Sequence, residues 1–225
     1  IGEDGVHFRH ELTGEEIFLG PREAMQIEND LGADIIMAFD ECIPYPASHD
    51  YSHKSIKKTL RWAEACLEAH KRPDQALFGI VQGSTYDDLR RECAQALTAM
   101  DFPGYAIGGV SVGEGLELLK KVVDCTEPYL PENKPRYLMG VGLPEDILES
   151  IERGMDMFDC VIPTRHARNG QLFTSRGTVK FRHAGYRIQA RGNARAHCRW
   201  CDGLPLRHRR RHGRSHRQTG PAQPG

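Results

Sequence analysis

The sequence lacks any apolar run that approaches the roughly 20 residues needed to cross a bilayer. Its first residues, Ile-Gly-Glu-Asp, form neither a basic segment nor an apolar signal core. The 7 cysteines are scattered and odd in number, which is typical of reduced thiols rather than of a disulfide framework. These absences disfavour a membrane protein and a secreted scaffold and favour a cytoplasmic location. With 225 residues, 39% of them hydrophobic, the chain can bury a real core.

Acidic residues and lysine are scarce at the C-terminal end. Residues 181–225 hold eleven Arg, no Lys and one acid, Asp202, so this segment carries +10 and the preceding residues carry −11. It shows no hydrophobic period, and its composition is typical of disorder. A basic arm that grips RNA and an ending translated out of frame are both open interpretations. We therefore predict two regions, 1–182 and a basic, disordered tail at 183–225.

Five short apolar runs alternate with five helical patterns in the first region. Strands separated by single helices are expected to be parallel, because a tight hairpin cannot connect them. The runs are 34–39, 77–81, 105–107, 136–141 and 157–162, and the helical patterns are 21–31, 55–70, 85–100, 116–130 and 144–154. Thr85, followed by Asp88, is the predicted N-cap of the third helix.

Polar residues and glycines stand at or near the end of strand after strand, as Asp40, Gln82, Gly109, Gly140 and Asp159 show. A (β/α)8 barrel places such residues around its active-site mouth, whereas a doubly wound sheet would favour a G-x-G-x-x-G turn, which is absent. We favour an α/β fold of the TIM-barrel type that is incomplete, with about five β/α units. The chain is therefore expected to be a C-terminal piece of a longer enzyme.

Two strand-end carboxylates are candidates for chemistry at a sugar. One carboxylate of such a pair can attack an anomeric carbon, although a single Asp at a strand end more often caps a helix or anchors a loop. Asp40 precedes a loop with two prolines, and Asp159 precedes a loop that bears Arg165 and Arg168. An acid beside two arginines suits an anionic, phosphate-rich substrate.

Five long motifs resemble those of bacterial tRNA-guanine transglycosylases (queuine tRNA-ribosyltransferases), in the same order. They are 33–46 (with Phe-Asp-Glu-Cys-Ile-Pro-Tyr-Pro), 78–83, 104–114 (with Gly-Gly-Val-Ser-Val-Gly-Glu), 136–146 and 156–170 (with Pro-Thr-Arg-His-Ala-Arg-Asn-Gly). The resemblance runs from about residue 1 to about residue 182. It implies a pentosyltransferase of queuosine biosynthesis that exchanges guanine at the wobble position of tRNAs with a GUN anticodon for 7-aminomethyl-7-deazaguanine (preQ1).

The resemblance also implies roles for single residues. Asp159 is the nucleophile that attacks C1′ of the ribose and forms a covalent enzyme–RNA intermediate. Asp40 accepts hydrogen bonds from N1–H and the exocyclic amine of the base, while Gln82 and the backbone N–H of Gly109 donate to its O6. A valine at position 112 resembles the enzymes that use preQ1. Cys42, Val110 and Met139 complete the substrate contacts.

Two further segments correspond to the RNA-contacting parts of the family. We expect a helix N-terminus in the first of them to be able to hold a phosphate. The predicted RNA-binding residues are Gly140, Val141, Gly142, Leu143, Pro144, Glu145 and Asp146 in one segment and Thr164, Arg165, His166, Ala167 and Arg168 in the other.

The sequence departs from the family pattern in two places. The general-base aspartate belongs to a Ser-Gly-Gly-Phe-Gln motif that is not found here, so the chain is not expected to close a barrel or turn over by itself. The zinc motif is reduced to Cys198 and Cys201, with Ala196 where a further cysteine is expected and His208 and His212 following. Zn²⁺ belongs to the family, and we expect this chain to bind it weakly or not at all.

Three other interpretations were weighed. A non-catalytic tRNA-binding subunit has no use for the intact nucleophile and base-recognition residues. A generic barrel enzyme acting on small phosphorylated molecules leaves the Pro-Thr-Arg-x-x-Arg stretch without a role. The archaeal type of the family is disfavoured by the bacterial-looking substrate motif. The resemblance further implies a homodimer.

Overall fold

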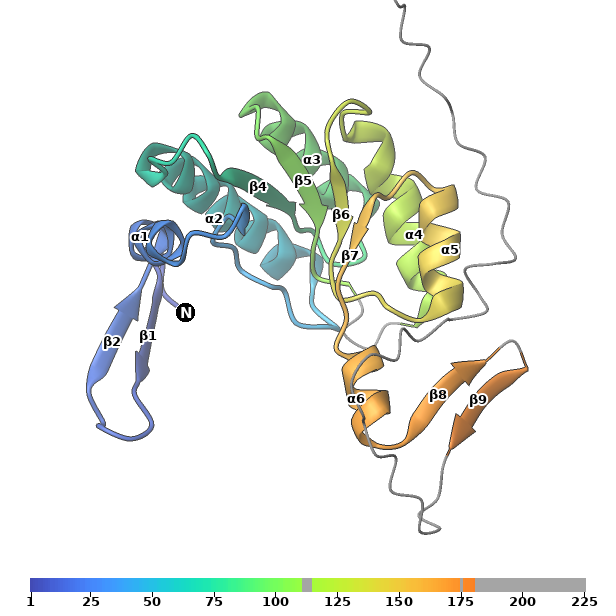
Figure 1. Cartoon of the computed structure of the whole chain (residues 1–225). Helices are drawn as coiled ribbons and strands as arrows, with labels where there is room; N and C mark the ends of the chain where they lie inside the picture. The colour runs from blue at the N-terminus through green and yellow to red at the C-terminus, as the bar shows by residue number, and fades with distance from the viewer. Residues whose placement is uncertain (111–114, 175, 181–225) are drawn as a thin grey trace, which may run out of the picture. The chain divides into compact units, whose positions relative to one another are not determined.

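A five-stranded parallel sheet forms the centre of the compact unit Ile1–Phe181 (Figure 1). The computed structural model describes residues 1–110, 115–174 and 176–180. The sheet consists of β3 (Ile35–Met37), β4 (Ala76–Val81), β5 (Gly104–Ile107), β6 (Arg136–Leu138) and β7 (Met157–Phe158), in that spatial order. Every neighbouring pair is parallel, with Ile36 opposite Leu77 and Leu138 opposite Phe158.

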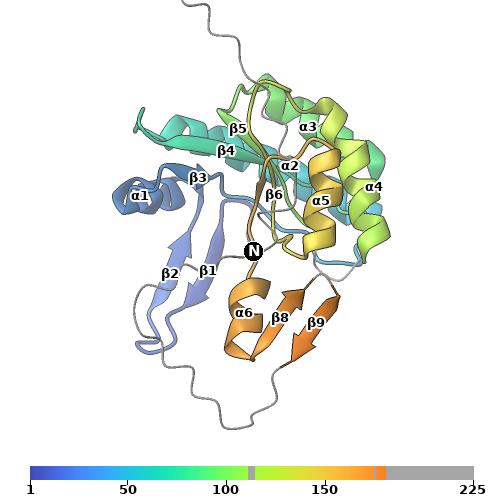
Figure 2. The ribbon, with the colours of Figure 1, turned by 45° about the vertical axis from the view of Figure 1, so that its right-hand side comes forward.

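The strand order agrees with the predicted barrel type. A doubly wound sheet reverses its strand order at a switch point, whereas this sheet adds each strand beside the previous one in sequence. Figure 2 shows the sheet curling, with helices along one side. The prediction of an incomplete TIM-barrel-type fold is therefore confirmed.

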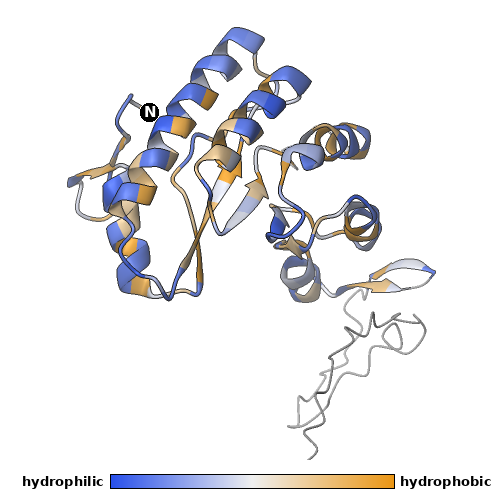
Figure 3. Cartoon of the chain, turned by 90° about the horizontal axis from the view of Figure 1, so that it is seen from above, coloured by the Kyte–Doolittle hydropathy of each residue, from blue (hydrophilic) through white to orange (hydrophobic). Residues whose placement is uncertain are grey.

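The helices contact one another in chain order, as the helices of such a barrel do. Each is amphipathic, and Figure 3 shows hydrophilic and hydrophobic residues along all of them. They are α1 (Pro21–Leu31), α2 (His49–Ala69), α3 (Asp87–Ala99), α4 (Leu116–Thr126) and α5 (Pro144–Glu152). A 3-10 turn, Glu127–Tyr129, follows α4.

The core lies between the sheet and these helices. On α3 the buried residues follow the helical repeat, and they pack with the buried side chains of β4 and β5. The members of the core include Leu77, Val81, Tyr105, Ile107 and Leu138 from the strands and Ile56, Cys66, Cys93, Leu97, Leu119 and Val123 from the helices. This packing holds the strands in register, and their carboxyl ends therefore meet along one edge.

The element boundaries differ from the predictions in several places. α2 begins at His49, earlier than predicted, because Ser48 caps it by accepting a hydrogen bond from the Tyr51 N–H. The N-cap of α3 is Tyr86 rather than Thr85, and it makes no side-chain capping bond. The strands at 136–141 and 157–162 are shorter than expected, so Asp159 follows β7 instead of lying within a strand.

One short helix and two hairpins were not predicted. The segment after Asp159, expected to be a loop, contains a short helix, α6 (Ile162–Arg168). Two antiparallel hairpins also form, one from β1 (Val6–Arg9) and β2 (Glu16–Leu19), the other from β8 (Gln171–Thr174) and β9 (Gly177–Lys180). Their strands are mostly exposed, so the apolar periodicity that marks a buried strand is weak there.

No helix in the described part of the chain is long and apolar enough to span a membrane.

Candidate active site

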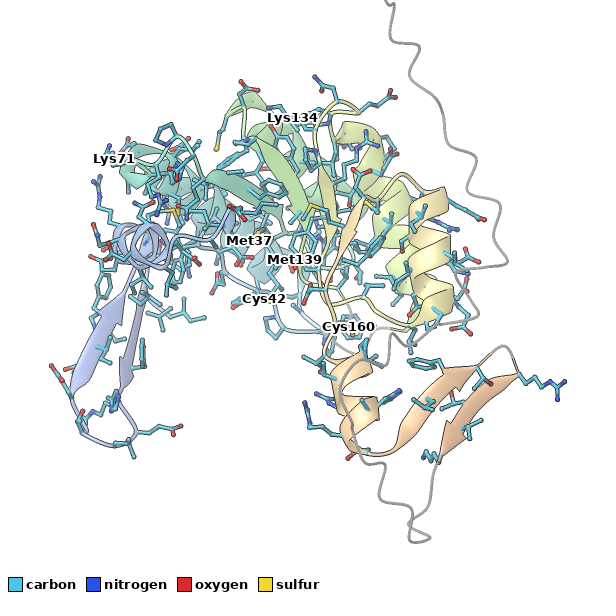
Figure 4. The ribbon with its side chains drawn as sticks, viewed as in Figure 1. Met37, Cys42, Lys71, Lys134, Met139 and Cys160 are labelled. Carbon is cyan, nitrogen blue, oxygen red and sulfur yellow. The ribbon has the colours of Figure 1, made fainter. Side chains whose placement is uncertain are left out.

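The carboxyl ends of the five strands bring the predicted site residues to one edge of the sheet. Figure 4 shows Cys42, Met139 and Cys160, which follow β3, β6 and β7, toward the same end of the sheet. Lys71 and Lys134, which precede β4 and β6, lie at the other end. In parallel strands all carboxyl ends share one edge, and this shared edge gathers residues that are far apart in sequence.

Asp40 and Gln82 are bonded to each other at this edge. The Gln82 Nε2–H donates to Asp40 Oδ2 at 2.7 Å, and the Gln82 side chain is buried with its Oε1 lacking a hydrogen-bond partner among the described residues. Burial raises the pKa of the Asp40 carboxyl above its usual range, while the Gln82 hydrogen bond opposes this rise. A half-buried carboxylate beside a buried amide with a free oxygen is a polar surface that a hydrogen-bonding ligand can satisfy.

The neighbouring carboxylate, Glu41, contacts α2 instead of Gln82. It is only 4% exposed, and its side chain accepts hydrogen bonds from Lys58 Nζ and Tyr51 OH, both at 3.3 Å. Its backbone N–H donates to Thr59 Oγ1 at 3.1 Å. These three contacts anchor the start of the β3–α2 loop, and Asp40 is thereby left on the side of the loop that meets Gln82.

Gly109 lies at the end of β5, against Gln82. Its φ of +64° is in the left-handed region, and an added Cβ would lie 2.3 Å from Gln82 Oε1. Position 109 therefore requires glycine for two reasons: its backbone is left-handed, and Gln82 leaves no room for a side chain. Val110 is buried, Cys42 is exposed, and Val112 lies outside the described residues.

Asp159 stands directly after β7 and is exposed. Its Oδ1 accepts two hydrogen bonds, from Tyr137 OH at 2.6 Å and from the Gly140 N–H at 2.8 Å. Burial and the bond to Asp159 raise the pKa of Tyr137, which therefore stays protonated and remains a donor. Both bonds reach the same oxygen, so the carboxylate is oriented while Oδ2 is left for another contact.

The predicted RNA-binding residues flank Asp159. Arg165 and Arg168 are exposed on α6, and the His166 ring packs at a tilt against Phe173 of β8 with ring centroids 4.9 Å apart. The other segment runs from Gly140 into α5, where Pro144 occupies the first turn. Glu145 and Asp146 add two carboxylates to that turn, which stabilise the helix but oppose a phosphate there. Thr164 Oγ1 donates to the Val161 carbonyl at 3.0 Å.

Cys198 and Cys201, the candidate metal ligands, lie outside the described residues. Within 1–110, 115–174 and 176–180, no group of three or more His, Cys, Asp or Glu side chains is placed to hold a metal ion. The zinc site of the family stays a prediction for this chain.

Comparison with known proteins decides the family. The family model described as "Queuine tRNA-ribosyltransferase" matches residues 1–217. This chain belongs to that family. Proteins named queuine tRNA-ribosyltransferase from three bacteria are similar to it. The protein from Halalkalibacterium halodurans is 61% identical over 187 residues, that from Lysinibacillus sphaericus 58% over 187 residues, and that from Halothermothrix orenii 59% over 186 residues. Each alignment covers 83% of this chain, which spans about half the length of these relatives (49%, 49% and 50%).

The family assignment inferred from the motifs is thus confirmed. Sequence reasoning missed Tyr137 and Glu41 at this site, because a tyrosine in a strand and an acid beside another acid carry no distinctive pattern. It also missed Arg90, a fully buried arginine on α3. A charged residue on the apolar stripe of a predicted helix was a signal that could have found it.

Gly142 lies in the loop after β6 and packs against Cys160, the residue that follows Asp159. A Cβ at position 142 would lie 2.0 Å from Cys160 Cβ. We expect Gly142→Ala to lower the free energy of unfolding by about 3 kcal/mol, because the overpacked loop must move away from Cys160. Urea unfolding followed by circular dichroism measures the change.

A double variant tests the cause of this loss. Cys160→Gly removes the atom that the new Cβ would meet, so Gly142→Ala combined with Cys160→Gly should cost less than the two single changes added together. Additive losses would show that the methyl group added at position 142 does not meet the Cys160 side chain.

Proposed function

We propose that this chain carries the nucleophile and the base-recognition groups of a tRNA-guanine transglycosylase, an enzyme that replaces guanine at the anticodon wobble position of GUN tRNAs with preQ1. The observation that carries the proposal is the different setting of two strand-end carboxylates. Asp40 is half-buried and paired with Gln82, as a base-recognition group should be, whereas Asp159 is exposed and oriented through one oxygen, as a nucleophile should be. The relatives are named queuine tRNA-ribosyltransferases, and this name supports a transfer reaction at a tRNA ribose.

Base recognition uses the groups at the ends of β3, β4 and β5. When guanine enters, its N1–H and exocyclic amine donate to Asp40 and replace the Gln82 amide as donors. The released Gln82 N–H and the Gly109 N–H then donate to O6. Adenine presents an amine in place of O6 and no N1–H, so it would leave these half-buried groups unpaired, and discrimination follows from that cost.

The exchange proceeds by two displacements at one carbon. Asp159 Oδ2 attacks C1′ of the ribose, the glycosidic bond breaks, and guanine departs with the electron pair and takes up a proton from solvent at N9. The incoming base gives up its N9 proton to solvent and attacks C1′, and Asp159 leaves as a free carboxylate. Two inversions retain the configuration of the sugar. Tyr137 and the Gly140 N–H hold the carboxylate at Oδ1 during both steps.

The polynucleotide is held by groups beside the nucleophile. The exposed guanidinium groups of Arg165 and Arg168 suit the phosphates that flank the wobble nucleotide. The base must leave the anticodon stack to reach the strand ends, and a loop nucleotide is extruded at low cost. The Gly140–Asp146 segment is proposed to contact the RNA through its loop part rather than through the acidic first turn of α5. A homodimer and a cytoplasmic location follow from the family as further proposals.

A covalent adduct provides the test. The full 225-residue chain is incubated with unmodified GUN tRNA and run on a denaturing gel. We expect one protein–tRNA band, because the first displacement alone links Asp159 to the ribose. Release of the RNA by added guanine or preQ1 is expected to be slow, because the chain lacks the general-base motif. A tRNA with adenine at the wobble position should give no band. Tight tRNA binding without any adduct would reject the transferase in favour of a binding role.

A further inference from the structure

Arg90 is fully buried, and its guanidinium bridges the ends of two strands. Its Nη1 donates to the Val81 carbonyl at 2.9 Å and to the Gly108 carbonyl at 2.8 Å. These two carbonyls belong to the residues just before Gln82 and just before Gly109. One side chain from α3 therefore connects the end of β4 to the end of β5 at the point where each donor to O6 stands.

The same guanidinium holds the loop that follows Gln82. Its Nε donates to the Ser84 carbonyl at 2.8 Å, and Nη2 lies 3.5 Å from the Gly109 carbonyl. Ser84 has a φ of +52°, a left-handed conformation that is unusual for a residue with a side chain. Gly83 packs so closely on this helix that an added Cβ would lie 2.8 Å from the Arg90 backbone nitrogen. The loop is thus folded around Arg90.

We propose that Arg90 is a positioning residue for recognition of guanine O6. This inference rests on the proposed function and extends it to a side chain that touches neither the base nor the RNA. By holding the Val81, Ser84 and Gly108 carbonyls, Arg90 sets the distance between the Gln82 amide and the Gly109 N–H. Those two groups must converge on a single acceptor atom, so a small change in their separation weakens O6 recognition.

Arginine is suited to this role for a geometric reason. The guanidinium is planar and presents five N–H donors in fixed directions, so it can reach carbonyls on two strands and a loop at once. A lysine at this position keeps the positive charge but has one nitrogen on a flexible stem. Arg90→Lys therefore separates the effect of charge from the effect of the donor geometry.

The test compares Arg90→Lys with Leu97→Ala in the full chain. Leu97 is fully buried on the same helix, about two turns further along, so its truncation lowers overall stability while the Arg90 guanidinium keeps its hydrogen bonds to the carbonyls. Ser84→Pro is a second variant, since proline cannot adopt a φ of +52° and the Ser84 carbonyl must leave Arg90. If Arg90→Lys does not fold, Ser84→Pro still tests whether the contact between Arg90 and the Ser84 carbonyl positions the two strand ends.

Hydrogen exchange gives a readout that does not depend on guanine. The Gly108 N–H donates to the Val81 carbonyl at 3.0 Å, and the Tyr86 N–H donates to the Gly83 carbonyl at 3.2 Å. We expect Arg90→Lys and Ser84→Pro to speed exchange of these two amides relative to the rest of the chain. Leu97→Ala should not single them out. An equal response in all three variants, or none, would overturn the proposal.

Ligand binding gives the second readout. Calorimetry with guanine and 6-thioguanine compares two bases that share N1–H and the amine and differ at the O6 acceptor. Arg90→Lys should weaken guanine binding by about tenfold and 6-thioguanine binding by less, whereas Leu97→Ala should leave the ratio unchanged. An unchanged ratio in Arg90→Lys would reject the inference. If the unaltered chain binds no guanine, the proposed function fails, and hydrogen exchange still decides the role of Arg90.

Discussion

Asp159→Asn is expected to abolish the covalent protein–tRNA adduct, with a loss of at least about 10⁴-fold in its rate of formation. The amide keeps the size of the side chain and can still accept the hydrogen bonds from Tyr137 and Gly140. It has no anionic oxygen to form an ester with C1′, so the site keeps its shape and loses its nucleophile. Adduct formation is measured on denaturing gels with end-labelled tRNA.

Two further variants show whether the loss belongs to this carboxylate. Asp156→Asn removes a charge just before the same strand, where the side chain accepts from the Arg136 N–H, and should leave the adduct intact. Tyr137→Phe keeps the carboxylate but removes one of its two donors, so adduct formation should slow by about tenfold. An adduct that persists in Asp159→Asn, or a ribose linked to another side chain, would show that Asp159 is not the nucleophile.

Asp40→Asn is expected to weaken guanine binding by about 100-fold. The carboxylate accepts two N–H groups of the base through charge-assisted hydrogen bonds, whereas an asparagine offers one oxygen and turns an N–H₂ group toward a donor. Calorimetry with the full chain measures the loss. Asp34→Asn, just before the same strand β3, is the matched control and should bind guanine as the unaltered chain does.

Although Asp40→Asn should weaken guanine binding, it should stabilise the fold. Burial raises the pKa of Asp40 in the folded chain, so its ionised form opposes folding once the pH exceeds that raised pKa. We expect Asp40→Asn to raise the free energy of unfolding at neutral pH by up to about 1 kcal/mol. The gain should disappear in acid, where the carboxyl of the unaltered chain is already protonated. A gain that is equal at both pH values would contradict this cause.

The elements that sequence alone predicted are those whose signal is local. The helix at 21–31 was predicted to the residue, because Pro21 begins it and Gly32, with a φ of +71°, ends it. The short helix α6 was missed for the converse reason. It has only 7 residues, begins with a proline in its first turn and lacks a long apolar repeat, so nothing in its sequence separates it from a loop.

The site residues also divide into those that the sequence could predict and those that it could not. Asp40, Gln82 and Asp159 could be named because each lies in a long motif beside a predicted strand end. Tyr137 could not be assigned to Asp159 from the sequence, since 22 residues separate them and only the pairing of β6 with β7 brings them to 2.6 Å.

Sequence alone determined the family and the alternation of strands and helices, and it predicted the reacting groups, because motif spacing and hydrophobic period are properties of neighbouring residues. Only the tertiary structure decided which groups support them: Arg90 under Gln82 and Gly109, Tyr137 on Asp159, and Cys160 against Gly142. The physical reason is that the carboxyl ends of parallel strands meet at one edge. Residues there become neighbours through sheet pairing and core packing, which the order of residues along the chain does not reveal.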